Sequence, residues 1–182
     1  MRRFTMLAIC LLAVASFMAM PAWAQNPHFI SASDALSTTE NLGDIVVSFK
    51  ESGVGNNALI DFTAAADGTA TYACINGGGN HPSASNKVTV NGPVSASGQF
   101  PSGKNGTISQ SLTIEEPTPG SFSCPGGQTF VLADVSFKNV SITDTTNGVA
   151  ESNLGDLSKV FCDINNLTKA TIKNCAVPDP TP

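Results

Sequence analysis

Apolar residues recur at every second position in several short stretches of this 182-residue chain. In residues 45–50, for example, Ile45, Val47 and Phe49 share one side, and residues 60–64 repeat the pattern. Side chains of a β-strand point alternately to the two faces of a sheet, so this period predicts strands with one buried face. Turn residues recur roughly every eight to twelve positions, which favours an all-β fold, an immunoglobulin-like antiparallel β-sandwich of about seven to nine strands.

Two glycine-containing turns are expected between these strands. An Asp-Gly pair at residues 67–68 is predicted to reverse the chain, so that residues 57–74 form a hairpin. An Asn-Gly-Pro sequence at residues 91–93 is expected to end the next strand.

The longest strand signal covers residues 129–143 and changes its parity along the way. Apolar residues occupy the odd positions of 131–137 and then the even positions 140 and 142. A straight strand cannot keep both groups on one buried face. Either a β-bulge lies near residues 138–139 or the strand passes from one sheet contact to another, and the bulge is the favoured prediction. Beyond residue 148 the apolar spacing is weakly helical and allows a short helix.

The chain divides into a leader, a body and a C-terminal extension. Residues 1–24 carry two arginines, an apolar run and an A-x-A pattern, which predicts a secretory signal peptide cleaved after Ala24. Residues 25–148 are expected to form the β-sandwich, 149–176 a disulfide-closed extension and 177–182 a flexible tail. The exported protein is therefore expected to be secreted or periplasmic, with no membrane-spanning segment after cleavage.

Four cysteines remain after the leader, and an even number in an exported chain indicates disulfides. Four cysteines allow three connectivities. Cys162 and Cys175 lie close in sequence and are expected to close a local loop, which leaves Cys74 and Cys124 to pair across the body. A zinc site is disfavoured because no C-x-x-C pair is present, so no metal is expected.

The stretch from Asn26 to about Gly148 resembles a family of small secreted bacterial proteins with no established activity. The most specific elements are a Cys-x-Asn-Gly-Gly-Gly-Asn loop at residues 74–80 and a Cys-Pro-x-Gly-Gln element at residues 124–128. The resemblance implies export but supplies no catalytic residue.

The loop after Cys74 is the predicted ligand-contacting segment. It brings together amide and imidazole groups that can hydrogen-bond sugar hydroxyls or peptide, and the candidate ligand-binding residues are Tyr72, Asn76, Asn80 and His81. Glycines 77–79 do not continue into the helix that a dinucleotide site requires, so no cofactor is expected.

No catalytic residue is assigned. Only two histidines are present, and the chain lacks a G-x-S-x-G nucleophile elbow. Glu115 and Glu116 are adjacent, so they are expected to point to opposite faces as solvent-facing residues, unlike a glycosidase pair.

The net charge argues against another class of function, the binding of nucleic acids. Fourteen acidic against nine basic residues give a net charge of −5, which disfavours nucleic-acid binding. We expect a non-enzymatic interaction or structural module whose partner is an envelope or extracellular protein or glycan. The alternative is a carbohydrate-binding module, which the Asn-rich loop favours and the scarcity of Trp and Tyr disfavours.

Overall fold

The computed structural model describes residues 26–37, 42–76, 86–166 and 175, and these contain eight strands. In chain order the strands are β1 (His28–Leu36), β2 (Ile45–Ser52), β3 (Leu59–Ile75), β4 (Lys87–Pro101), β5 (Thr107–Ile114), β6 (Thr129–Asp144), β7 (Val149–Ser152) and β8 (Leu157–Val160).

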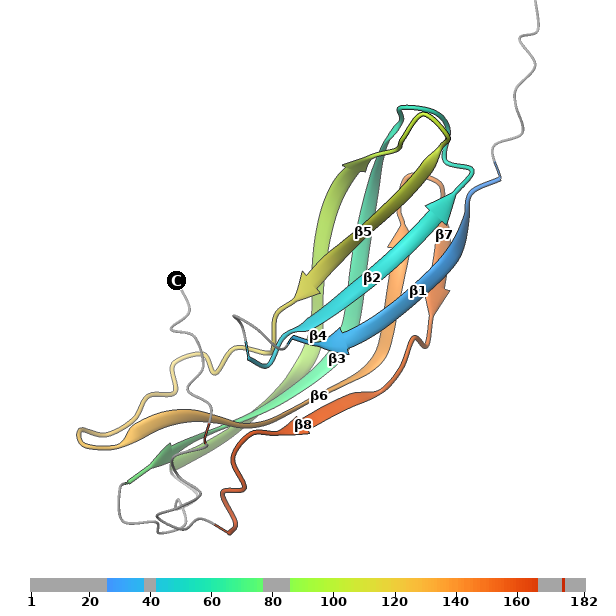
Figure 1. Ribbon diagram of the computed structural model, residues 1–182. Helices are drawn as coiled ribbons and strands as arrows, with labels where there is room; N and C mark the ends of the chain where they lie inside the picture. Colours follow the sequence, from blue (N-terminus) through green and yellow to red (C-terminus); the bar gives the residue numbers. More distant parts are fainter. Residues whose placement is uncertain (1–25, 38–41, 77–85, 167–174, 176–182) are drawn as a thin grey trace, which may run out of the picture.

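The strands form two antiparallel sheets that face one another (Figure 1). The smaller sheet has the order β1-β2-β5. The larger has the order β4-β3-β6-β7, with β8 also paired to β6. The larger sheet continues past the end of the smaller one, so only part of it is sandwiched (Figure 1). The predicted all-β antiparallel sandwich is confirmed.

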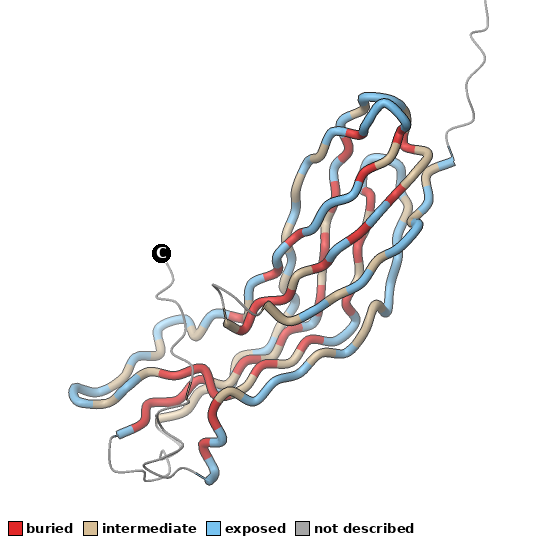
Figure 2. Tube along the Cα trace, viewed as in Figure 1, coloured by how far each residue is buried: buried red, intermediate tan, exposed pale blue. Residues whose placement is uncertain are grey.

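The main core lies between the two sheets, and buried residues alternate with more exposed ones along the strands that border it (Figure 2). On β2 the side chains of Ile45, Val47 and Phe49 are buried, whereas Ser48 and Lys50 between and beyond them are exposed. The ring of Phe49 packs against that of Phe62 on β3, with 4.5 Å between ring centroids. Period-two patterning therefore assigns the faces of β2 correctly.

Neither predicted Gly turn reverses the chain. β3 runs through residues 67–68 and β4 runs through residues 91–93 without a break. The two sites lie opposite one another in one long antiparallel pair, with Asp67 facing Pro93 and Gly68 facing Gly92. The predicted hairpin at 57–74 is therefore wrong. Pairing of β3 with both β4 and β6 outweighs the local turn preference.

The predicted bulge in β6 is confirmed. Pairing with β3 shifts register between Ala65 and Asp67, opposite Asn139 and Val140, and Asn139 adopts a positive φ of 53°. A second shift occurs nearer the start of β6, opposite the Thr71–Tyr72 step. Val131 and Ala133 consequently join a second apolar cluster rather than the main core that holds the rest of the odd-numbered series.

The segment after residue 148 forms two short strands, and the helix allowed by its spacing is not formed. β7 pairs with the end of β6 and β8 with its middle, so residues 149–160 extend the larger sheet. The disulfides Cys74–Cys124 and Cys162–Cys175 form as expected. Cys162 and Ile164 lie in the second apolar cluster with Ala73, Ile75, Val131 and Ala133.

Candidate functional site

A groove opens where the chain leaving β5 crosses the middle of β4. It has a volume of about 350 Å³ and is lined by residues 90–95 of β4 and residues 115–118. We call it the Gly92 groove. Its apolar walls come from Val90, Val94 and Pro117 together with Pro93, and its charged groups are Glu115 and Glu116. Its lining, as far as the structure describes it, includes no basic side chain.

Two facing glycines create this groove for different reasons. A Cβ added to Gly68 on β3 would lie 2.8 Å from Cγ of Pro117, so only glycine lets the chain after β5 pack so closely on the sheet. A Cβ added to its cross-strand partner Gly92 would meet no atom within 4 Å. Gly92 therefore leaves open space above the strand, and a glycine inside a strand often marks close approach by a ligand or another chain.

Glu116 is half-buried and belongs to an acidic cluster beside the groove. Its backbone N–H donates to Oδ1 of Asp44 at 3.2 Å, and its Oε1 accepts a hydrogen bond from the Tyr72 hydroxyl at 3.3 Å. Asp44 is almost fully buried, and its Oδ2 has no hydrogen-bond partner. Burial, together with neighbouring Asp44, raises the pKa of the Glu116 carboxyl to about 7. Near neutral pH this carboxyl is therefore present in both its protonated and its ionised form.

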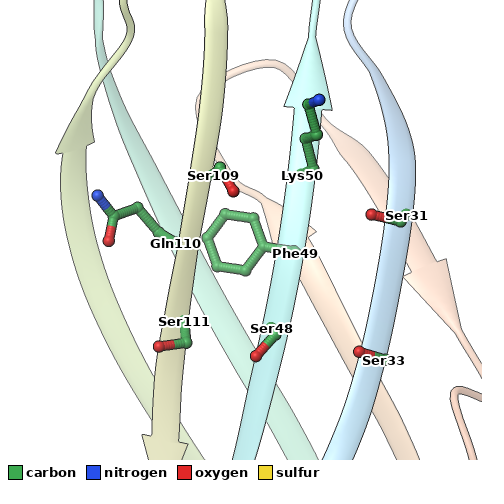
Figure 3. Close-up of a pocket in the computed structure, with 8 residues that line it drawn as sticks. All are labelled: Ser31, Ser33, Ser48, Phe49, Lys50, Ser109, Gln110 and Ser111. Atoms are coloured by element: carbon green, nitrogen blue, oxygen red, sulfur yellow. The ribbon is translucent and has the colours of Figure 1, made fainter.

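The outer face of the smaller sheet forms a second, flatter surface (Figure 3). A shallow hollow of about 460 Å³ lies here, and its polar lining comes from Ser31 and Ser33 on β1, Ser48 and Lys50 on β2, and Ser109, Gln110 and Ser111 on β5. We call the five serines with Lys50 the serine face.

Strand register arranges the serine face in rows. Ser33, Ser48 and Ser111 are cross-strand partners, and Ser31, Lys50 and Ser109 form the next row. Partners on adjacent strands lie about 5 Å apart, so the hydroxyls form a regular array. Lys50 supplies the only charge on the serine face.

A second pair of buried acidic residues lies between the two sheets. Its members are distant in sequence from the residues that line the Gly92 groove. Glu51 on β2 and Asp144 at the end of β6 are both fully buried. Asp144 accepts hydrogen bonds from the backbone and side-chain nitrogens of Asn147, which closes the β6–β7 turn. Burial and the neighbouring Asp144 raise the pKa of Glu51 to about 7. Asp144 stabilises the turn, and Glu51 is buried in the core. Neither residue lines either surface described above.

The predicted ligand-binding residues do not form one site within the described residues. Tyr72 is buried, and its hydroxyl also donates to the Pro117 carbonyl at 2.8 Å, so it offers no surface to a ligand, and its predicted role is corrected. Its phenol holds the chain after β5 in place. Asn76 is exposed directly after β3. Asn80 and His81 lie outside the described residues.

Sequence patterns alone missed the Gly92 groove. The sequence pattern predicts Gly92 in a turn and Glu116 in solvent, whereas Glu116 is half-buried and lies beside the Asp44 carboxyl. The available signal was the Glu-Glu-Pro sequence at the end of an apolar strand, which gives no indication of what lies opposite it.

Among the described residues, no group of three His, Cys, Asp or Glu side chains could hold a metal ion. His28 is exposed, and its Nδ1 lies 2.8 Å from the Asn26 carbonyl oxygen. No helix in the described part of the chain is long and apolar enough to cross a membrane. Comparison with known protein families, curated proteins and solved structures gave no match to this chain.

Proposed function

We propose that the protein is an exported, non-enzymatic interaction module that docks an envelope or extracellular protein along β4. The leader pattern and the two disulfides support export to the periplasm or the medium. An immunoglobulin-like sandwich, which the sequence leads us to expect, would suit this role, because such folds present strand edges and faces to partners.

The Gly92 groove is the observation that carries the proposal. Within the described residues, β4 pairs with β3 alone, so alternate residues of this strand direct backbone groups away from the sheet. The groove lies on the same strand and combines apolar walls with two carboxylates. An extended segment of a partner could hydrogen-bond to the strand edge and place a side chain in the groove.

Site-specific photo-crosslinking tests this proposal. A benzoylphenylalanine at Ser95, an exposed groove residue, is expected to capture an envelope protein in intact cells. The same group at Ser158 on β8 is the control, because β3 and β6 separate that strand from β4. A Gly92→Leu change should remove the Ser95 product by filling the groove. Equal products at both positions, or persistence in Gly92→Leu, would contradict docking at β4.

The alternative function, a carbohydrate-binding module, is favoured by the serine face. Its hydroxyl rows could hydrogen-bond a flat polysaccharide, and short serine side chains lose little rotamer entropy on binding. Because Tyr72 is buried, binding would depend on these hydrogen bonds without aromatic stacking from that residue.

Retention on insoluble polysaccharides tests the alternative. If it holds, the oxidised protein is retained on one polysaccharide and is released by the soluble oligomer. Replacing Ser48 and Ser111 with alanine should weaken retention, whereas Ser158→Ala should not. Retention that is insensitive to these changes would exclude the serine face.

A further inference from the structure

The Gly92 groove also indicates the chemistry of what it binds. We propose that it takes a cationic group on an apolar stem, namely the side chain of a lysine or arginine presented by the protein partner. This inference rests on the proposed docking along β4 and adds the residue type that the partner must present.

The shape of the groove suits a single long side chain. Its volume of about 350 Å³ is at the small end of the range for ligand pockets. Val90, Val94 and Pro117 offer apolar contact to methylene groups, and the space above Gly92 is open to a chain lying on the strand. Lysine and arginine bury their methylene stems in this way while their charged ends reach a polar group.

Charge at the groove selects the sign of the ligand. Glu115 and Glu116 line it, and its described lining supplies no cation to offset them. Behind Glu116 lies the buried carboxyl of Asp44, whose Oδ2 lacks a hydrogen-bond partner. A cation in the groove would offset this concentration of negative charge, whereas an anion would increase it.

Binding should therefore be linked to a proton on Glu116. The titratable groups that contact it are Asp44, which precedes β2, and Tyr72 on β3, and Glu115 is its chain neighbour. A nearby cation favours the ionised carboxylate, so the complex should release a proton where free Glu116 is protonated. Affinity should consequently rise from pH 6 to pH 8.

An NMR titration of the exported, oxidised protein tests the inference directly. The probe is Nα-acetyl-lysine N-methylamide, and Nα-acetyl-norleucine N-methylamide is its uncharged counterpart. The lysine probe should give saturable amide shifts in residues 90–95 and 115–118. The norleucine probe should bind about tenfold more weakly, because it lacks one charge-assisted contact.

Matched variants locate the binding. Gly92→Leu should abolish the shifts, because its side chain would occupy the groove and its Cβ meets no atom. Gly126→Leu is the control, since Gly126 is exposed, equally unobstructed and outside the groove. Glu116→Gln should weaken the lysine probe by about tenfold and remove the pH dependence of its affinity.

Three results would each overturn the inference. The norleucine probe could bind as tightly as the lysine probe, the amide shifts could fail to saturate, or the Gly92→Leu variant could bind the lysine probe as well as the wild type does. The outcome is separable from that of the cross-linking experiment. A Ser95 cross-link without lysine binding would keep the docking surface and reject the cation. Lysine binding without a cross-link would keep the cation site and reject docking of a partner along β4.

Discussion

At the scale of single residues, the surroundings of individual glycines and carboxyl groups differ sharply between positions. Gly68 and Gly92 are cross-strand partners, yet their surroundings are opposite: one is pressed against Pro117 and the other faces open space. The buried acids likewise have different settings. Glu51 lies in the core with Asp144, while Glu116 borders a groove with Asp44 behind it. Effects of substitution should follow these surroundings rather than residue type.

Alanine at the two facing glycines should give opposite results. Gly68→Ala should lower the free energy of unfolding by about 1–3 kcal/mol, because the new Cβ forces Pro117 and the chain around it to move. Gly92→Ala should leave stability unchanged or raise it by up to about 1 kcal/mol, since alanine restricts the unfolded chain. Chemical denaturation of both variants measures the difference. Equal destabilisation would show that Pro117 does not press on the sheet.

The buried Glu51 should make stability depend on pH. Its pKa rises from an ordinary 4.5 to about 7 on folding, so the folded state holds the proton more tightly than the unfolded state. This stabilisation is complete below about pH 4.5 and is lost as pH rises through about 7. Glu116 adds to the loss in the same direction and the same window.

Glu51→Gln should therefore flatten this dependence. Relative to the wild type, the variant should gain up to about 3 kcal/mol between pH 5 and pH 8, the value of the full pKa shift. Denaturation curves at several pH values measure this gain. Asp61→Asn, at an exposed carboxyl that binds Gln99, is the control and should keep the wild-type slope. A Glu51→Gln slope equal to that of the wild type would contradict a protonated Glu51 in the core.

Among the elements, β6 contributes buried side chains to both apolar clusters. Its bulge at Asn139 carries the apolar series across a change of parity, and its earlier register shift places Val131 and Ala133 in the second cluster. Asn139 also donates from Nδ2 to Oδ2 of Asp67 at 2.7 Å, which ties the bulge to β3. The conformation at this one residue therefore sets which faces of β6 are buried.

Replacing Asn139 tests the bulge. Its φ of 53° is accessible to asparagine and glycine but strained for a β-branched residue. Asn139→Val should cost about 1–2 kcal/mol, whereas Asn139→Gly should cost less because only the hydrogen bond to Asp67 is lost. Thermal unfolding of the pair measures the difference. A more stable valine variant would mean that β6 runs straight.

These elements show what the sequence could and could not predict. The faces of β2 and the bulge of β6 follow from alternation along the strand itself, which is a local property. The turns predicted at residues 67–68 and 91–93 are wrong because β3 and β4 pair without a break from Leu59 opposite Pro101 to Ala73 opposite Lys87. The Gly92 groove was missed for the same reason: its two walls are distant in sequence, and only the fold places Glu116 beside β4.

At the scale of the whole molecule, two apolar clusters divide the larger sheet. The main core fills the space between the sheets, and the second cluster contains Cys162 together with Ala73 and Val131. Cys162 belongs to the second cluster, and its disulfide partner Cys175 packs against that cluster. Cys74–Cys124 links β3 to the segment before β6, and Cys162–Cys175 closes the C-terminal loop.

Removing each disulfide should therefore lower the free energy of unfolding by a different amount and affect a different part of the molecule. In the chain-entropy model, the separation of 50 residues between Cys74 and Cys124 corresponds to about 4 kcal/mol and the separation of 13 between Cys162 and Cys175 to about 3 kcal/mol. Paired alanine substitutions should destabilise in that order, as measured by denaturant unfolding.

Hydrogen exchange should show where each loss acts. Without the Cys162–Cys175 bridge, Ile164 and its neighbours lose the covalent closure of the loop that packs them against β3 and β6. Exchange should then quicken around Ala73 and Val131, while amides of β2 in the main core keep their protection. Because the two clusters lie on one continuous β6, uniform acceleration across β2 and β6 would instead mean that the whole sandwich opens as a single cooperative unit.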